Sequence, residues 1–452
     1  MEKHLRRGKA MAIFLAIIAG LVLLAGCGSG KTGQQKGAAS KAEKVCKIGI
    51  IGPFTGPAAR TGEEFKNSIT MAFDEIGNKV GNYRLQVVWI DDESDAEKGA
   101  RAYEQAIVKD KIDVGFMDWH SWVSVSCMDI AAKYKMPHFF SFGAGETINQ
   151  KIKGNYEKYK YWVGKAWPTA SLLTSAYVET VNEAVQKGIW KPRNKKFAIY
   201  GVDNDWGRSF GGGIKKQLVD TGWELTSEAW VAIGESDFYP LLSKLKKEDV
   251  SLIAGTMSDP SSIAAFIKQT KEVGVKCLII SDGLGWVGEW YNLVGKASDY
   301  VLDQIPQWTT PAAKKFKNDF TKRFGFEPGP SAAGMCYDWT RFFIKVMNTA
   351  LSEYGDLSTE SFRKVADNFV IPGKLTFTDG IIHKEYKYTP ESFPDPVVDQ
   401  QHYVFPVIQY FDGKGKIVWP IAWKEQDLAI PNFEAVGPGS RDDGTGVGMR
   451  AV

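Results

Sequence analysis

The residues from Ala25 to Thr32 have the spacing of a phosphate-binding loop: an alanine, four residues, then Gly30, Lys31 and Thr32. In such a loop, backbone N–H groups and a lysine hold nucleotide phosphates, but only where a strand leads in and a helix begins at the lysine. Residues 33–44, GQQKGAASKAEK, have no apolar periodicity that would bury one face of a helix. The pattern therefore does not predict nucleotide binding.

The same stretch fits an export and lipidation signal. Residues 11–24 carry no charge, and they follow four basic residues between positions 3 and 9. A basic segment and then an apolar one are typical of a cleaved export signal, and fourteen residues are too few to span a bilayer. Leu-Ala-Gly-Cys at 24–27 resembles the cleavage box of bacterial lipoproteins. We predict a signal peptide over residues 1–26, a lipid anchor at Cys27 and a flexible tether over residues 27–44.

Length and charge limit the function of the remaining chain. The 426 residues after position 26 carry 52 basic and 52 acidic side chains. This length exceeds what one hydrophobic core usually supports, so we expect two lobes. A neutral, evenly charged surface argues against nucleic acid as a partner. No later run reaches eighteen apolar residues, so the lipid is expected to be the only membrane attachment.

Cysteine and histidine usage predicts no metal or other cofactor. The four cysteines after Cys27 show no metal-binding spacing, and the chain has only five histidines. The sequence does not decide whether any of these cysteines form disulfides. They are Cys46, Cys127, Cys277 and Cys336.

From Cys46 onward, short apolar runs alternate with segments of helical periodicity. Strands are expected over residues 46–51, 85–90, 112–117 and 138–142, and in a second series over 196–201, 250–255 and 277–281. Helices are expected over residues 65–76 and 121–134, and a hairpin over 406–420 that turns at Asp412. Alternating strands and helices predict the α/β class, with parallel sheets covered on both faces. Two series predict two doubly wound, Rossmann-like lobes with a ligand at the carboxyl ends of their strands.

Three blocks carry a family resemblance: residues 47–76, 90–107 and 200–218. They resemble the branched-chain amino-acid (Leu/Ile/Val) binding proteins, which are type I periplasmic binding proteins and serve as receptors for ABC importers. The resemblance spans about residues 45–420. It implies two hinged lobes that close around one small ligand, with an ABC permease and its ATPase subunit as partners. The expected lobes are 45–165 plus about 306–370, and 166–305 plus about 371–452.

The resemblance implies that the first lobe holds a ligand carboxylate with a hydroxyl and backbone N–H groups. Ser121 matches the family's carboxylate-binding serine, and a plain helix cap is the alternative. The loop that begins at Ser141 matches the family's backbone donor loop, with Ala144 and Gly145 as further contacts. Gly145 stands where the family has a threonine, so that hydroxyl is missing.

Thr61 stands where some members carry an aromatic residue, and we expect it to be a smaller pocket wall. The adjacent Arg60 fits either an anionic ligand or, more simply, a solvated helix start.

In the second lobe, the resemblance implies an aromatic side chain over the ligand and an acidic partner for its ammonium group. Trp206 matches the aromatic position, with lobe packing as the alternative. Asp282 lies close to the acidic position, although Asp-Gly is also a common turn pair. Met257 and Asp259, near the end of another strand, are further candidates.

Several aromatic residues distinguish this chain from the family pattern. Trp119, His120 and Trp122 surround Ser121, and Trp286 and Trp290 follow Asp282. Aromatic side chains at a binding site supply large, stiff contact surfaces. Some members join two first-lobe positions by a disulfide, and Ser94 and His120 replace those partners here.

We therefore predict an exported, lipid-anchored receptor on the periplasmic or extracellular face, and no enzyme. The candidate ligands are an amino acid, an amide and an aromatic acid, and the sequence leaves the choice open. A sensor that presents its closed form to a signalling receptor is the alternative function.

Overall fold

The computed structural model describes residues 43–399, 402 and 405–433. The predicted signal peptide and Cys27 lie outside the described residues. The first strand, β1 (Lys44–Gly52), begins at the last residue of the predicted tether.

The first sheet has the order β2-β3-β1-β4-β5-β6. Besides β1 it contains β2 (Lys79–Val80), β3 (Tyr83–Asp91), β4 (Val114–Phe116), β5 (His138–Ser141) and β6 (Trp162–Lys165). Neighbouring strands are parallel, except that β2 runs antiparallel to β3. Residues 48–52 of β1 are all buried, as expected for a strand with a neighbour on each side and helices on both faces.

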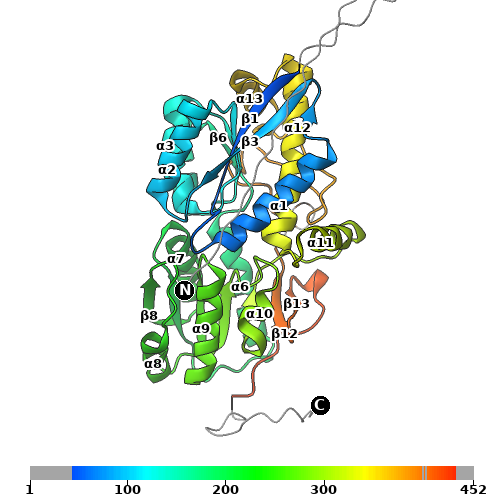
Figure 1. Ribbon diagram of the computed structural model, residues 1–452. Coiled ribbons are helices and arrows are strands. Elements are labelled where there is room, and N and C mark those ends of the chain that lie inside the picture. Colours follow the sequence, from blue (N-terminus) through cyan, green and yellow to red (C-terminus); the bar gives the residue numbers. More distant parts are fainter. Residues whose placement is uncertain (1–42, 400–401, 403–404, 434–452) are drawn as a thin grey trace, which may run out of the picture. The chain divides into compact units, whose positions relative to one another are not determined.

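Helices α1 (Ala59–Glu75), α2 (Ala96–Gln105), α3 (Ser121–Tyr134), α4 (Glu146–Gly154) and α5 (Tyr156–Tyr159) belong to this first part of the chain. On α1, Phe65, Ile69 and Phe73 recur every four residues and are buried. A distant segment, α12 (Cys336–Tyr354), lies beside α1 (Figure 1). Its Phe343 ring stacks on Phe116 of β4 with centroids 4.4 Å apart, so α12 completes the core of the first lobe.

The second sheet has the order β13-β12-β11-β10-β9-β7-β8. Its parallel strands are β7 (Lys196–Val202), β8 (Glu224–Val231), β9 (Leu252–Thr256), β10 (Leu278–Asp282) and β11 (Leu302–Asp303). Sequence periodicity missed β8, because this edge strand is only half-buried and has no continuous apolar run. Strands β12 (Val407–Phe411) and β13 (Lys414–Trp419) form the predicted hairpin, which turns at Asp412-Gly413.

Further helices accompany the second sheet: α6 (Ala170–Gln186), α7 (Asp205–Asp220), α8 (Tyr239–Lys247), α9 (Pro260–Val273) and α10 (Trp290–Val294). Two others, α11 (Pro311–Phe324) and α13 (Thr359–Val365), follow in the chain. The chain passes between the two sheets after β6, after β11 and again before β12. The two sheets confirm the predicted α/β fold with two lobes.

A buried polar cluster lies where the chain leaves β6. The ammonium of Lys165 is fully buried and lies 2.8 Å from Asp395 Oδ1. It also donates to Asn149 Oδ1 and Thr169 Oγ1, both at 2.8 Å. These contacts join β6, α4 and the start of α6 to the returning segment near residue 395. They fix the first crossing at both of its ends.

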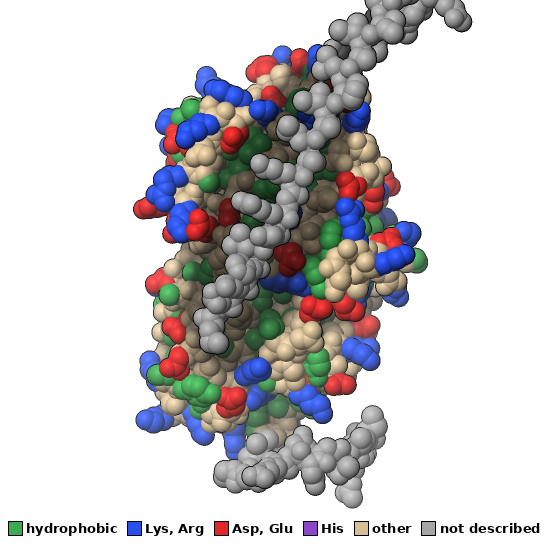
Figure 2. Space-filling view, in the orientation of Figure 1, with side chains coloured by type: hydrophobic (Ala, Val, Ile, Leu, Met, Phe, Trp, Pro, Cys, Tyr) green, Lys and Arg blue, Asp and Glu red, His purple; other side chains and the backbone are tan. Residues whose placement is uncertain are grey.

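Charged side chains of both signs are interspersed over the face drawn in Figure 2. The four cysteines in the described residues are buried and unpaired. Among those residues, no helix combines the length and apolar character needed to cross a membrane.

Candidate functional site

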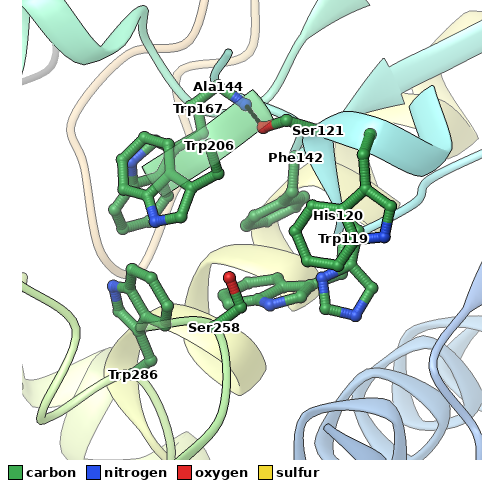
Figure 3. Close-up of a pocket in the computed structure, with 10 residues that line it drawn as sticks. Trp119, His120, Ser121, Phe142, Ala144, Trp167, Trp206, Ser258 and Trp286 are labelled. Carbon is green, nitrogen blue, oxygen red and sulfur yellow. Dashed lines mark hydrogen bonds between the residues drawn. The ribbon is translucent and has the colours of Figure 1, made fainter. Parts of the chain in front are cut away.

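A small cavity lies between the two lobes, where strands of both sheets end, with about 30 Å³ of space for the centres of water-sized spheres (Figure 3). The lining residues are Trp119, His120, Ser121, Trp122, Phe142, Ala144 and Trp167 from the first lobe and its crossing, and Trp206, Ser258 and Trp286 from the second. None of these side chains carries a formal charge at neutral pH.

Ser121 holds the loop that follows β5. Its Oγ accepts the backbone N–H of Ala144 at 3.0 Å and of Gly145 at 2.9 Å (Figure 3). The capping position of α3 is His120, which makes no side-chain cap, so the structure does not support the plain-cap alternative for Ser121. The serine therefore joins the start of α3 to the start of α4 within the pocket wall.

A fully buried carboxylate supports this loop from behind. Asp118 accepts hydrogen bonds from Ser124 Oγ and, at 2.7 Å, from Ser141 Oγ. Burial raises the pKa of Asp118 to about 6, while hydrogen bonds from the serines and Gly143 oppose that shift. Ser141 is thereby a supporting residue behind the cavity and not part of its lining.

Gly145 lies at a close approach between the two lobes. A Cβ at this position would lie 1.8 Å from Asp205 Oδ2, at the start of α7. Asp205 also accepts a hydrogen bond from Thr147 Oγ1, and Glu146 N donates to Ser209 Oγ at 3.0 Å. The glycine is needed here because only a residue without a side chain lets α4 and α7 meet in this way.

Tryptophans form most of the remaining wall. Trp206 is 5% exposed, and its Nε1 donates to Thr256 Oγ1 at 3.0 Å, which fixes the indole plane. Trp119 and Trp286 meet edge to face, with ring centroids 5.4 Å apart. The buried Nε1 of Trp286 has no hydrogen-bond partner among the residues that the structure describes. The aromatic positions predicted at 119, 206 and 286 thus come together from both lobes.

His120 and Ser94 lie in contact, at the two positions that a disulfide joins in some relatives of the predicted family. His120 Nε2 and Ser94 Oγ are 3.0 Å apart, and Trp122 Nε1 donates to Ser94 O at 3.2 Å. The His120 ring stacks on Trp122 with centroids 4.1 Å apart. Burial lowers the pKa of His120 to about 3, so this pocket wall is uncharged at neutral pH.

The structure does not bring Asp282 into the cavity lining. Asp282 is fully buried at the end of β10, where Tyr177 Oη donates to it at 2.8 Å. Burial and the neighbouring carboxyl of Asp303 raise its pKa. Asp282 therefore lies within the second lobe, outside the cavity lining, and its contact with a ligand ammonium stays a prediction.

Other predicted contacts also lie outside the lining. Asp259 caps α9, accepting from Ser262 N at 2.8 Å, and also accepts from Gly234 N at 3.2 Å. Thr61 is buried on α1, and Met257 is buried after β9. Arg60 pairs with acidic side chains, including Glu289 of the second lobe at 3.4 Å.

Trp290 lines a different groove, in which its ring packs on Tyr410 with centroids 4.2 Å apart.

Sequence reasoning missed three lining residues. Phe142 and Ser258 lie within stretches already identified as strand ends. That position is the sequence signal that could have identified them as lining residues. Trp167 follows β6, a strand that was not predicted, and only the crossing after that strand brings it to the cavity.

Two glycine motifs in the sequence match patterns that occur in enzymes, and sequence reasoning did not identify them. Residues 207–211 read G-x-S-x-G, but their Ser209 lies inside α7 and accepts from Glu146 N, whereas a nucleophile elbow needs a strand-to-helix turn. Residues 283–288 read G-x-G-x-x-G after β10. There the N–H groups of Gly283 and Gly285 donate to Asp303 at 2.8 Å, and only the five-residue α10 follows. Both motifs therefore form hydrogen bonds within the fold, in place of the contacts that the same motifs make in enzymes.

No group of three or more His, Cys, Asp or Glu side chains in the described part of the chain has the arrangement of a metal site.

Two α/β lobes with a cavity between their strand ends define a class of two-lobed ligand-binding proteins. A family model described as periplasmic binding protein matches residues 45–384. The chain belongs to this periplasmic binding protein family.

Individual relatives are distant. The Leu/Ile/Val-binding protein homolog 6 of Brucella suis biovar 1 (strain 1330) is 26% identical over 234 residues. The match covers 51% of this chain and 56% of that protein, so the chain spans just over half the length of this relative.

Solved structures match more of the chain. A putative branched-chain amino acid ABC transporter protein from Silicibacter pomeroyi has a TM-score of 0.69 and 18% identity, covering 86% of this chain and 100% of that one. A solute binding protein of an ABC transporter from Rhodopseudomonas palustris BisB5, solved with 3,4-dihydroxy benzoic acid, has a TM-score of 0.66 and 21% identity. That match covers 82% of this chain and 95% of the other. These likenesses confirm the predicted two-lobed fold.

Proposed function

We propose that this protein is a lipid-anchored extracytoplasmic receptor that captures a small solute between its lobes and delivers it to an ABC permease. The cavity shared by both lobes carries the proposal, because a ligand that contacts both lobes favours the closed arrangement over the open one. Family membership supports export, and the lipobox at 24–27 supports the anchor at Cys27.

The proposed ligand is an amino acid or a related amide or aromatic acid. A carboxylate suits the start of α3 beside Ser121, because helix N-termini attract anions. The names of the relatives support both kinds of acid: Leu/Ile/Val in the Brucella protein and 3,4-dihydroxy benzoic acid in the Rhodopseudomonas one. The lining has no carboxylate that would pair with a primary ammonium, which weakens the case for an unmodified amino acid.

A ligand screen of the purified protein tests this proposal. Amino acids, amides and aromatic acids are each added at millimolar concentration, and thermal unfolding is followed by intrinsic fluorescence. A micromolar ligand should raise the free energy of unfolding by about 4 kcal/mol at that concentration. A screen in which no small molecule shifts the transition would contradict the receptor function.

A further inference from the structure

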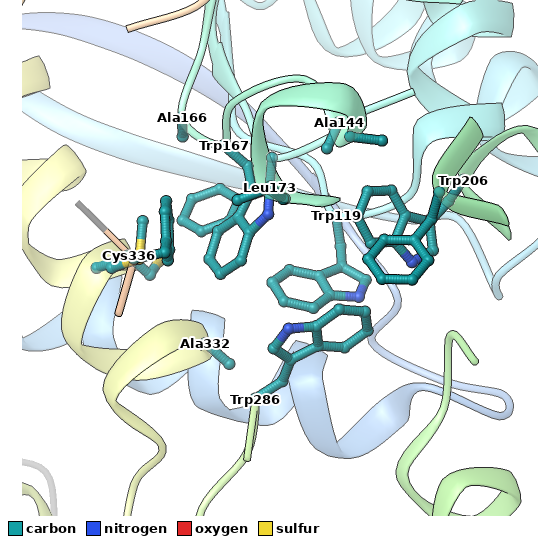
Figure 4. Close-up of a cluster of buried hydrophobic side chains, with 14 of the residues drawn as sticks. Trp119, Ala144, Ala166, Trp167, Leu173, Trp206, Trp286, Ala332 and Cys336 are labelled. Atoms are coloured by element: carbon teal, nitrogen blue, oxygen red, sulfur yellow. The ribbon is translucent and has the colours of Figure 1, made fainter. Parts of the chain in front are cut away.

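Residues 286–289 form a short segment that carries Trp286 into the cavity wall. The segment follows β10, so chain order places it in the second lobe. Its backbone is nevertheless bonded to the first lobe. Gly288 N donates to Glu64 Oε1 on α1 at 2.7 Å. Trp286 O accepts Ala332 N at 3.0 Å, from the helical turn that leads directly into α12, and the two residues lie side by side in Figure 4.

The residues on either side of this segment are bonded to the second lobe. Gly283 and Gly285 each donate a backbone N–H to Asp303 at the end of β11, both at 2.8 Å. On the other side, the ring of Trp290 packs on Tyr410 of β12. The chain therefore leaves the second lobe after Gly285, contacts the first lobe through four residues, and returns at Trp290.

The contact between the segment and the first lobe is too close to admit side chains. A Cβ at Gly288 would lie 1.7 Å from Glu327 O, and one at Gly329 would lie 2.3 Å from Trp286 O. Such an approach needs glycine on both sides of the contact. The ring of Trp286 also meets the first lobe, because it lies edge to face with Trp119.

Glu64 joins the two sides of this contact. Its carboxyl group is fully buried and accepts Gly288 N through Oε1 and Gly329 N through Oε2, at 2.7 and 2.8 Å. The first donor belongs to the segment, and the second belongs to the chain that leads into α12. Arg60 lies 3.6 Å from the same carboxyl group and pairs with Glu289 at the end of the segment. Without Glu64, two backbone N–H groups would lose their acceptor, which favours separation of the two sides.

We propose that Glu64 is a positioning residue for the binding site, because it fixes residues 286–289, and with them Trp286, to the first lobe. Trp286 then stays beside Trp119 when the lobes separate, and the cavity opens between these two rings and Trp206. This inference rests on the proposed receptor function, in which the lobes separate and close around a solute. It identifies a residue that shapes the first-lobe half of the site.

Hydrogen exchange of the purified protein, resolved to single amides, tests this attachment. In Glu64→Ala, the amide of Gly288 should exchange about tenfold faster or more, because its acceptor is removed. The amides of β10, which lies between two strands of the second sheet, should exchange as in the wild type. An unchanged rate at Gly288 would overturn the inference. An equal acceleration in β10 would also overturn it, because it would report a general loss of stability.

Glu63→Ala is the matched control, because its half-exposed side chain pairs with Arg60 on the same helix. It should leave the exchange of Gly288 unchanged. If it accelerated that amide as much as Glu64→Ala, the effect would belong to α1 as a whole, and the role of Glu64 would be wrong.

Fluorine NMR of the protein labelled with 5-fluorotryptophan reports the surroundings of Trp286 directly. Trp286→Phe assigns its resonance. That resonance should shift in Glu64→Ala and stay in place in Glu63→Ala. A Trp286 resonance that is the same in Glu64→Ala as in the wild type would contradict the positioning role.

A second variant tests whether the segment moves with the first lobe. Asp205→Ala combined with Ser209→Ala removes the second-lobe acceptors of Thr147 and Glu146 at the start of α4. The amide of Glu146 should then exchange faster, while Gly288 stays protected. Acceleration of both amides would show that the segment moves with the second lobe.

These measurements need no solute, so they separate the two proposals. If they fail, the assignment of Glu64 is wrong and the receptor function stands. A ligand screen without a hit would contradict the receptor function and leave the attachment of residues 286–289 to the first lobe measurable.

Discussion

At the scale of single residues, Ser121 Oγ accepts two backbone N–H groups, those of Ala144 and Gly145. Ser121→Ala would leave both buried donors without their acceptor. We expect the free energy of unfolding to fall by about 1–3 kcal/mol, and ligand affinity to fall with it. Urea unfolding followed by tryptophan fluorescence measures the first effect, and titration calorimetry the second.

Ser352→Ala, at an exposed position on α12, is the matched control and should change stability by less than about 0.5 kcal/mol. If Ser121→Ala were as stable as this control, Ser121 would not hold the loop.

Glu64 on α1 provides a test by pH. Its buried carboxyl group accepts Gly288 N at 2.7 Å and Gly329 N at 2.8 Å, and burial raises its pKa to about 8. Since the pKa is higher in the folded state, the folded protein holds this proton where the unfolded chain releases it. Stability should therefore fall as pH rises from about 4.5 to about 8.

Between pH 6.5 and 7.5 the free energy of unfolding should fall by about 1.2 kcal/mol. Glu64→Gln should remove this fall, as measured by urea unfolding across that range. Glu63→Gln, the half-exposed neighbour, should keep the wild-type slope. An unchanged slope in Glu64→Gln would show that this carboxyl group does not hold the proton.

At the scale of elements, the starts of α4 and α7 touch at Gly145 and Asp205. Gly145→Ala would place a methyl group into the Asp205 carboxyl and separate the two helices. We expect about a tenfold loss of ligand affinity, because closure must then overcome the overlap. Titration calorimetry with the ligand from the screen measures this loss.

Gly212→Ala on α7 is the control, because its added Cβ meets no atom within 4 Å. Alanine also favours a helix over glycine, so this variant should be as stable as the wild type or up to about 1 kcal/mol more stable. Equal affinities in the two variants would exclude a role for the contact at Gly145 in closure.

At the scale of the whole molecule, Cys27 is predicted to carry the lipid that keeps the protein at the membrane. We expect the wild type to partition into the detergent phase after expression in a bacterial host. Cys27→Ser should appear in the aqueous phase, because stable anchoring depends on the acyl chains. Detergent-phase separation with immunodetection measures this, and a membrane-bound Cys27→Ser protein would contradict the anchor.

Local sequence patterns predict most of the strands and helices and their order, although not β6 and β8. The spacing of Phe65, Ile69 and Phe73 predicts α1, and the apolar run at 46–51 predicts β1, because burial follows the periods of helix and strand. The hairpin at Asp412 and the start of α3 at Ser121 were also predictable from local patterns. The division into lobes near residues 165, 305 and 370 stays a prediction.

Which candidate residues share one cavity depends on the tertiary fold. Ser121, Trp206 and Trp286 line that cavity, whereas Asp282 accepts a hydrogen bond from Tyr177 inside the second lobe. Trp167, in the crossing after β6, also lines the cavity. The Glu64 carboxyl group accepts a hydrogen bond from Gly288 N, which is 224 positions away in the sequence. Local periodicity reports which face of an element is buried, but not which other element covers it. Those pairings depend on how the chain crosses between the lobes, and local sequence patterns do not specify them.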